Sequence, residues 1–194
     1  MRRYMGIDPG DAWTGYVSLK IGGGKYYAHM GVLRNGEYTF NDLVDTIIPA
    51  EDHYPKYTIV AESYQFRSQG FNTFNKGATP RLLGALHYAS LTKGWHWSEV
   101  IPKDPTDKTL NEFGIGRYLD RWTEFYPNPG DHRWIHARSA WRVLCQYLLM
   151  RGTNELAKLR TKTIPPLRPC EPILHGFVNR NELMAPSVCW EIPD

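Results

Sequence analysis

The stretch RYMGIDPGDAWTGYVSLKI, residues 3–21, decides the fold. An apolar run of strand length over residues 3–8 leads into the tight-turn sequence DPGD at residues 8–11. A second strand-like run follows over residues 14–21, and three glycines then favour a hairpin into a third strand over residues 25–33. The amino terminus is therefore predicted to form an antiparallel meander of three strands.

Beyond the meander the pattern alternates between strands and helices. Short buried strands are predicted over residues 57–61 and 95–101, and helices over residues 41–48, 79–93, parts of 106–126, and 131–151. Thr79 is the expected N-cap of the second helix, and Gly94 its end. This order predicts an α/β fold with a mixed five-stranded sheet, three antiparallel strands first and parallel strands after, flanked by helices.

The end of the chain has a different composition. Repeated prolines after Thr163 exclude regular helix there. We therefore expect one domain over residues 1–152 and a basic, then proline-rich, C-terminal extension over residues 153–194.

The charge is unevenly distributed along the chain. The protein has 194 residues, 42% of them hydrophobic, and a formal net charge of +3. Residues 1–130 carry 14 basic and 14 acidic side chains, whereas residues 131–168 carry eight basic and two acidic ones. A basic block of this kind suits a polyanionic partner, although solvated helix faces are basic too.

The sequence also excludes several protein classes. Three cysteines without CxxC spacing are expected to be packing residues of a reduced, cytoplasmic protein. No apolar stretch approaches the ~20 residues of a membrane span, and no signal peptide is recognisable, so no membrane partner is expected.

Two carboxylates stand where predicted buried strands end. Asp8 closes the first strand, and Glu62 directly follows the apolar triplet Ile-Val-Ala at residues 59–61. If the two strands are parallel neighbours, both side chains lie at the edge where open α/β sheets place ligands. Oxygen ligands of this type bind Mg²⁺ or Mn²⁺, and two such ions can drive phosphodiester hydrolysis. The alternative for Asp8 is a purely structural role in the turn, and the same role is favoured for Asp11.

Further ligands are available at the start of the longest helix. Asp131 is the expected N-cap, and His132 and His136 lie four residues apart on one side of the helix. Taken alone, Asp131 is favoured as a plain cap, and the two histidines are favoured as a packed aromatic pair; together with Asp8 and Glu62 they favour a site.

At this point the sequence resembles the RuvC-type Holliday junction resolvases, over residues 3–150. The resemblance is carried by the following motifs: YMGIDPGDAWTGY at 4–16, IVAE at 59–62 with Phe66, TPRLLGAL at 79–86, WSEVIP at 97–102 with Lys108, and HARSAWR at 136–142. It implies an RNase H-like fold, a homodimer, a Mg²⁺ or Mn²⁺ site with two ions, and paired nicking of four-way DNA junctions. The short chain and its divergent tail suggest a phage-type member of the family, acting in the host cytoplasm.

The family's site residues map onto this chain with one departure. Asp8 and Glu62 match the first two acidic ligands. His136 stands where the family usually has aspartate, and the preceding turn offers Asp131 and His132. The resemblance therefore implies a catalytic and metal-binding set of Asp8, Glu62, Asp131 and His136, with His132 as a further ligand.

DNA contacts are implied by the same resemblance. The loop after Glu62 fits the family's junction-probing segment, with Phe66, Arg67, Phe71 and Phe74 as its main contacts. Those phenylalanines are equally suited to anchoring the loop or a dimer interface. Candidates for phosphate contacts are Lys76, Arg81, Lys103, Lys108, Arg133 and Arg138.

The sequence therefore predicts a metal-dependent, structure-selective DNA endonuclease. One alternative is a junction-binding protein of the same fold that has lost cleavage, in keeping with the missing aspartate. Another is an actin-like nucleotide-binding domain, but that architecture needs two such domains and a second phosphate loop, for which 194 residues leave no room.

Overall fold

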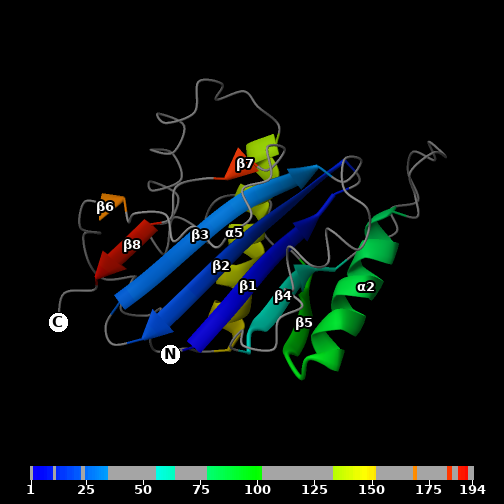
Figure 1. The fold of residues 1–194 in the computed structure, drawn as a ribbon, viewed down its shortest axis with the longest axis horizontal. Helices are drawn as coiled ribbons and strands as arrows, with labels where there is room; N and C mark the ends of the chain where they lie inside the picture. The colour runs from blue at the N-terminus through cyan, green and yellow to red at the C-terminus, as the bar shows by residue number, and fades with distance from the viewer. Residues whose placement is uncertain are drawn as a thin grey trace.

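The sheet at the centre of the molecule is shown in Figure 1. A computed structural model of the protein describes residues 2–10, 12–22, 25–34, 56–63, 78–101, 133–151, 168–169, 183–184 and 188–191. The central strands follow the order β5-β4-β1-β2-β3, with these bounds: β1 (Arg2–Pro9), β2 (Trp13–Gly22), β3 (Lys25–Arg34), β4 (Thr58–Glu62) and β5 (His96–Val100).

The strand directions agree with the sequence prediction. β1, β2 and β3 pair antiparallel in sequence, and the β1–β2 register runs from Arg2↔Ile21 to Pro9↔Thr14. β4 is parallel to β1, and β5 is parallel to β4. The predicted mixed five-stranded α/β sheet, antiparallel first and parallel after, is therefore confirmed, with strand limits within two residues of those expected.

Three short strands from the C-terminal extension enlarge this sheet beyond the predicted five. They are β6 (Arg168–Pro169), β7 (Leu183–Met184) and β8 (Val188–Glu191). β8 and β7 both pair antiparallel with β3, and β6 pairs with β8. A proline-rich segment is already extended and can add to a sheet edge, so the tail continues the sheet beside β3.

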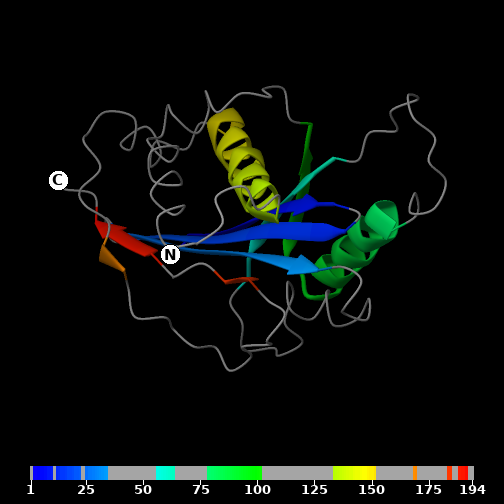
Figure 2. The same ribbon diagram turned by 90° about the horizontal axis from the view of Figure 1, so that it is seen from above.

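Two helices cover the sheet from opposite sides (Figure 2). α5 (Arg133–Met150) packs on the face formed by Tyr4, Val17, Met30 and Val60, and its own Trp141 and Leu144 are fully buried there. α2 (Ala78–Thr92) packs on the other face, where Met5, Ile7 and Ile59 meet Leu82 and Leu86. Alternate residues of β1 thus point to different cores, as expected for a strand buried on both faces.

Glycines in the first two strands allow α5 to lie directly on the sheet backbone. A Cβ atom at Gly6 would lie 2.5 Å from the carbonyl oxygen of Ala140. A Cβ atom at Gly15 would overlap the backbone of His136 and lie 2.5 Å from the amide nitrogen of Ala137. The absence of side chains at these two positions is what brings the start of α5 against the end of β1.

The limits of α2 differ in part from expectation. The helix begins at Ala78, so Thr79 lies inside its first turn, and the prediction of Thr79 as N-cap is wrong. Its end is as predicted: Gly94 has φ of +63°, its amide donates to the carbonyl of Leu91, and the Trp95 amide donates to that of Ser90. These two hydrogen bonds form a Schellman motif, which needs glycine at its left-handed position.

Several predicted helices lie wholly or partly outside the residues that the structure describes. The helices expected over residues 41–48 and 106–126, and the first two residues of the helix expected from residue 131, lie outside the described residues.

Cys145 is buried in α5 as a free thiol, as expected of a packing cysteine, and burial raises its pKa well above the ordinary range. No helix in the described parts of the chain is long and apolar enough to span a membrane.

Candidate active site

The centre of the candidate site is a contact between Asp8 and His136. Asp8 is the second-last residue of β1 and only 9% exposed. Its Oδ2 lies 2.8 Å from Nδ1 of His136, which is the fourth residue of α5. Two residues that are 128 positions apart in the chain are thus brought into hydrogen-bonding distance at the end of the first strand.

The local sequence explains why the imidazole sits there. The turn after β1 is closed by a hydrogen bond from the Gly10 amide to the carbonyl of Trp13, at 3.0 Å. A Cβ atom at Gly10 would lie 2.6 Å from Cε1 of His136 and 3.2 Å from its Nδ1. Gly10 and Gly15 therefore leave the space that the ring and the backbone of His136 occupy.

Glu62 ends the neighbouring strand at the same edge of the sheet. Ile7 pairs with Ala61 in the parallel β1–β4 register, so Asp8 and Glu62 are the next residues on adjacent strands. Val60 belongs to the core on the α5 side, and alternation places Glu62 on that side too. We call this end of the sheet, defined by Asp8 and Glu62, the carboxyl edge.

The side chains at the carboxyl edge combine two types of donor atom. Asp8 and Glu62 supply carboxylate oxygens, and His136 supplies ring nitrogens. When Nδ1 of a histidine donates to a carboxylate, its Nε2 is left as the acceptor, which is the usual arrangement of a metal-ligating or water-orienting imidazole. Oxygen donors with one imidazole fit a divalent cation such as Mn²⁺ or Mg²⁺.

The remaining predicted ligands cannot be placed. Asp131 and His132 lie outside the described residues, as does Asp11. Among the side chains that the structure does describe, no group of three or more His, Cys, Asp or Glu is close enough to hold a metal ion. The structure thus brings Asp8 and His136 together, and places Glu62 beside Asp8 through the strand register.

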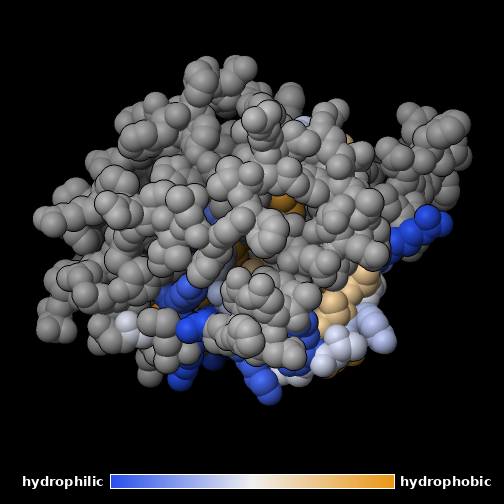
Figure 3. All heavy atoms as spheres, viewed as in Figure 1, coloured by the Kyte–Doolittle hydropathy of each residue, from blue (hydrophilic) through white to orange (hydrophobic). Residues whose placement is uncertain are grey.

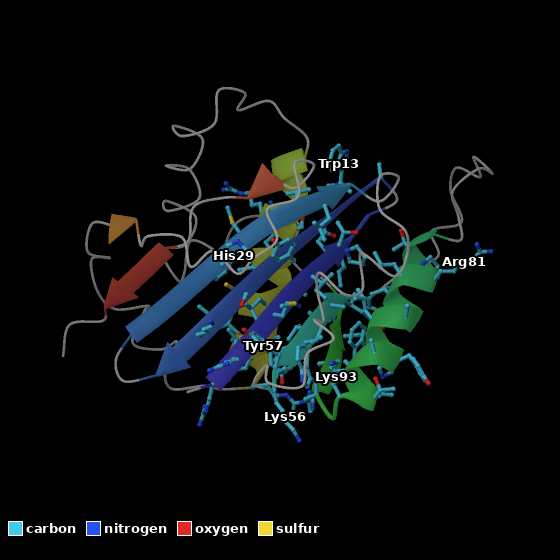
Figure 4. All side chains as sticks on the ribbon, in the orientation of Figure 1. Trp13, His29, Lys56, Tyr57, Arg81 and Lys93 are labelled. Carbon is cyan, nitrogen blue, oxygen red and sulfur yellow. The ribbon has the colours of Figure 1, made fainter. Side chains whose placement is uncertain are left out.

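Few of the predicted DNA contacts lie in described parts of the chain. Arg81 is exposed in the first turn of α2 and points away from the molecule (Figure 4). Arg138 is half-buried on α5, two residues after His136, and Arg133 is the first residue of that helix. The other candidates lie outside the described residues: Phe66, Arg67, Phe71, Phe74, Lys76, Lys103 and Lys108.

Sequence reasoning missed the role of the glycines. Gly10, read only as a turn residue, also makes room for the His136 ring, and Gly15 does the same for the helix backbone. A signal was available, because a glycine inside an apolar strand often marks a close approach by another backbone. Gly6 and Gly15 both carry that signal.

RuvC structures are among the solved structures that resemble this chain. A structure of Thermus thermophilus RuvC in complex with a Holliday junction substrate is 16% identical, covers 79% of this chain and 98% of its own, and has a TM-score of 0.49. A second Thermus thermophilus RuvC structure is 16% identical, with coverages of 78% and 97% and a TM-score of 0.46. No protein-family model matches the sequence, and a search of curated proteins finds no match.

Proposed function

We propose that the protein is a metal-dependent, structure-selective DNA endonuclease that hydrolyses phosphodiester bonds in branched DNA, as RuvC-type resolvases do. The observation that carries the proposal is the 2.8 Å contact between Asp8 and His136 at the carboxyl edge. The motifs that resemble the family at residues 4–16, 59–62 and 136–142 all contribute residues to this edge.

The cofactor would be Mg²⁺ or Mn²⁺, held by Asp8 and Glu62 with His136 beside them. Divalent cations supply Lewis acidity toward a phosphodiester and stabilise the negative charge that develops on the leaving oxygen. Asp131 and His132 are proposed as additional ligands, in keeping with their place before α5.

The protein's own groups would orient the reacting atoms. Asp8 holds Nδ1 of His136 and thereby fixes the direction of Nε2. Gly10 leaves room for the imidazole and Gly15 for the backbone of His136, and Nε2 would accept a hydrogen bond from water at the phosphodiester. In-line attack by that water would leave 5′-phosphate and 3′-hydroxyl ends.

The substrate is proposed to be a four-way junction and the protein a homodimer, because two symmetric nicks require two sites. α2 offers an apolar surface for such pairing, since Tyr88 and Leu91 are 72% and 59% exposed one turn apart. Sedimentation equilibrium tests the dimer, and Tyr88→Glu should shift the molecule toward the monomer if α2 forms the interface.

A nicking assay tests the activity. The protein should cut a labelled four-way junction in Mg²⁺ or Mn²⁺ but not in EDTA, and should leave a linear duplex of the same sequence uncut. Asp8→Asn and Glu62→Gln should each abolish cutting while leaving junction binding near the wild-type level, because binding depends on phosphate contacts.

A matched variant controls for loss of a carboxylate. Glu99 lies exposed on β5, where its Oε1 accepts a hydrogen bond from Nε1 of Trp97, and Glu99→Gln should cut at the wild-type rate. Cutting by Asp8→Asn within a few-fold of wild type would remove Asp8 from the site. Tight junction binding without any cutting would identify the alternative, a junction-binding protein that has lost catalysis.

A further inference from the structure

The opposite end of the sheet is strongly basic. Here β1, β4 and β5 begin and the helices α2 and α5 end. Figure 3 shows hydrophilic side chains gathered at this lower border, and Figure 4 places Lys56 and Lys93 there. We call the following cations the basic rim: Arg2, Arg3, Lys20, Lys56, Lys93 and Arg151.

No carboxylate balances the basic rim within the side chains that the structure describes. Asp8 and Glu62 both lie at the carboxyl edge. Glu99 lies on β5 beside Ala61, close to that same edge. The carboxylates that the structure describes therefore lie at the end of the sheet opposite to the basic rim.

Two cations of the rim lie at the ends of helices, which explains their position. Nζ of Lys56 lies 3.4 Å from the position that a Cβ of Gly94 would take, at the C-terminal end of α2. The guanidinium of Arg151 lies 5.5 Å from the ring centroid of Tyr147, at the end of α5. Positive charges are favourable at helix C-termini, so these residues need no external ligand.

Arg3 and Lys20 have no such reason. They are direct cross-strand partners in the β1–β2 register, and both are half-buried on the α2 side of the sheet. Like charges directly opposite each other on a sheet destabilise it. In the described parts of the chain neither side chain pairs with a carboxylate. Burial, and then the charge of Arg3, lowers the pKa of Lys20, in line with the repulsion expected from the register.

An anion placed between the two side chains would remove that cost. Tyr57 lies just before β4, next to this part of β1, and its ring lies 5.3 Å from that of Trp95. Paired cations beside an aromatic ring are the groups that bind a nucleic-acid backbone and its sugars.

We propose that Arg3 and Lys20 form a second DNA-contacting site, which binds the phosphate backbone of a DNA segment other than the one at the carboxyl edge. Arg3 and Asp8 are five positions apart on β1, a distance of about 17 Å. The two sites also face opposite sides of the sheet, so one phosphodiester group cannot occupy both. Branched DNA has several duplex arms and can supply both segments; the choice of DNA as ligand rests on the proposed nuclease function.

The test is a change of charge at Lys20. Lys20→Glu places an opposite charge across from Arg3, so the free protein should melt roughly 1–4 °C higher than wild type. Its affinity for a labelled four-way junction, measured by fluorescence anisotropy in EDTA, should fall. The slope of log K against log[salt] should also become shallower by about 0.9 for each lost phosphate contact.

Two further variants complete the experiment. Lys20→Arg keeps the charge and should bind with the wild-type affinity and salt slope. Arg3→Gln should weaken binding as Lys20→Glu does, and it replaces Lys20→Glu if that variant fails to fold. A more stable Lys20→Glu protein, or a folded Arg3→Gln protein, with unchanged affinity and salt slope would overturn the proposal.

The nicking assay separates this proposal from the function proposed above. A wild-type protein that fails to cut in Mg²⁺ or Mn²⁺, but whose binding depends on Arg3 and Lys20, would refute the nuclease and support the second site. Normal cutting, with junction binding unchanged in these variants, would support the nuclease and refute the second site.

Discussion

At position 136 the chain carries an imidazole in contact with the carboxylate of Asp8. If Nε2 of His136 ligates the metal directly instead of accepting a hydrogen bond from water, a nitrogen ligand in place of a carboxylate removes one negative charge from the site. It also favours Mn²⁺, because Mg²⁺ prefers oxygen ligands and retains its waters. We predict faster junction cutting with Mn²⁺ than with Mg²⁺, and His136→Asp should restore the use of Mg²⁺. Initial nicking rates over a range of each metal concentration measure both effects.

The variant His136→Ala tests whether His136 contributes to junction cutting. His136→Ala should slow cutting by about 10–100-fold, the usual loss when a group that supports a metal site is removed. If His136→Ala cuts as fast as wild type in both metals, His136 is only a packed helix residue. The third ligand must then be Asp131 or His132.

Lys20 gives a prediction about the stability of the protein. Its pKa is lowered in the folded state, chiefly by burial and then by Arg3, so above that lowered pKa the unfolded chain binds more protons than the folded one. The free energy of unfolding should therefore rise with pH from the lowered pKa up to about 10.5, the ordinary value. Urea unfolding at several alkaline pH values measures this rise. Lys20→Gln should flatten it, and an equally steep rise in that variant would assign the effect to another group.

At the scale of elements, the packing of α5 on β1 depends on Gly6. A Cβ atom there would lie 2.5 Å from the Ala140 carbonyl oxygen and 2.9 Å from both Cβ of Leu144 and Cγ1 of Val17. We predict that Gly6→Ala destabilises the fold by about 1–3 kcal/mol, because backbone and core atoms must move. Gly84 is the control: it is exposed on α2 with no atom within 4 Å of its Cβ position, so Gly84→Ala should stabilise the protein by up to about 1 kcal/mol. Urea unfolding of both variants gives the two signs.

The elements themselves were largely predictable from the sequence, for local reasons. Apolar runs of strand length and the glycine hairpin gave β1, β2 and β3, and Gly94 marked the end of α2. The start of α2 was misplaced because Thr79 has the side chain of a cap, and only backbone geometry distinguishes a cap from a first-turn residue. The strands β6, β7 and β8 were missed because they are two to four residues long and form only through pairing at the edge of β3.

The candidate site was predictable to a smaller extent. The convergence of Asp8 and Glu62 follows from parallel strands ending at one edge, a rule that needs only the strand directions. The contact between Asp8 and His136 joins residues far apart in the chain, and it depends on the space left at Gly10 and Gly15. Such packing is a property of the assembled fold, so the sequence could nominate His136 without showing what it touches.

At the scale of the whole molecule, charge is separated more strongly than the net value indicates. The formal net charge is only +3, yet the described carboxylates at the carboxyl edge and the basic rim lie at opposite ends of the sheet. Residues 131–168, which include α5, add eight basic and only two acidic side chains. A polyanion therefore meets strongly positive surfaces on a molecule that is nearly neutral overall.

This separation predicts a steep dependence of DNA binding on salt. Each phosphate that a lysine or arginine neutralises releases counterions, so a protein with several such contacts loses affinity by orders of magnitude between about 50 and 200 mM salt. We expect that loss for the wild-type protein on a four-way junction in EDTA, measured by fluorescence anisotropy. Arg138→Gln on α5 should make log K against log[salt] shallower by about 0.9 if that side chain neutralises one phosphate. A wild-type affinity that stays constant over this range would show that the basic surfaces serve a ligand other than DNA, because phosphate contacts made by lysine and arginine always weaken as salt rises.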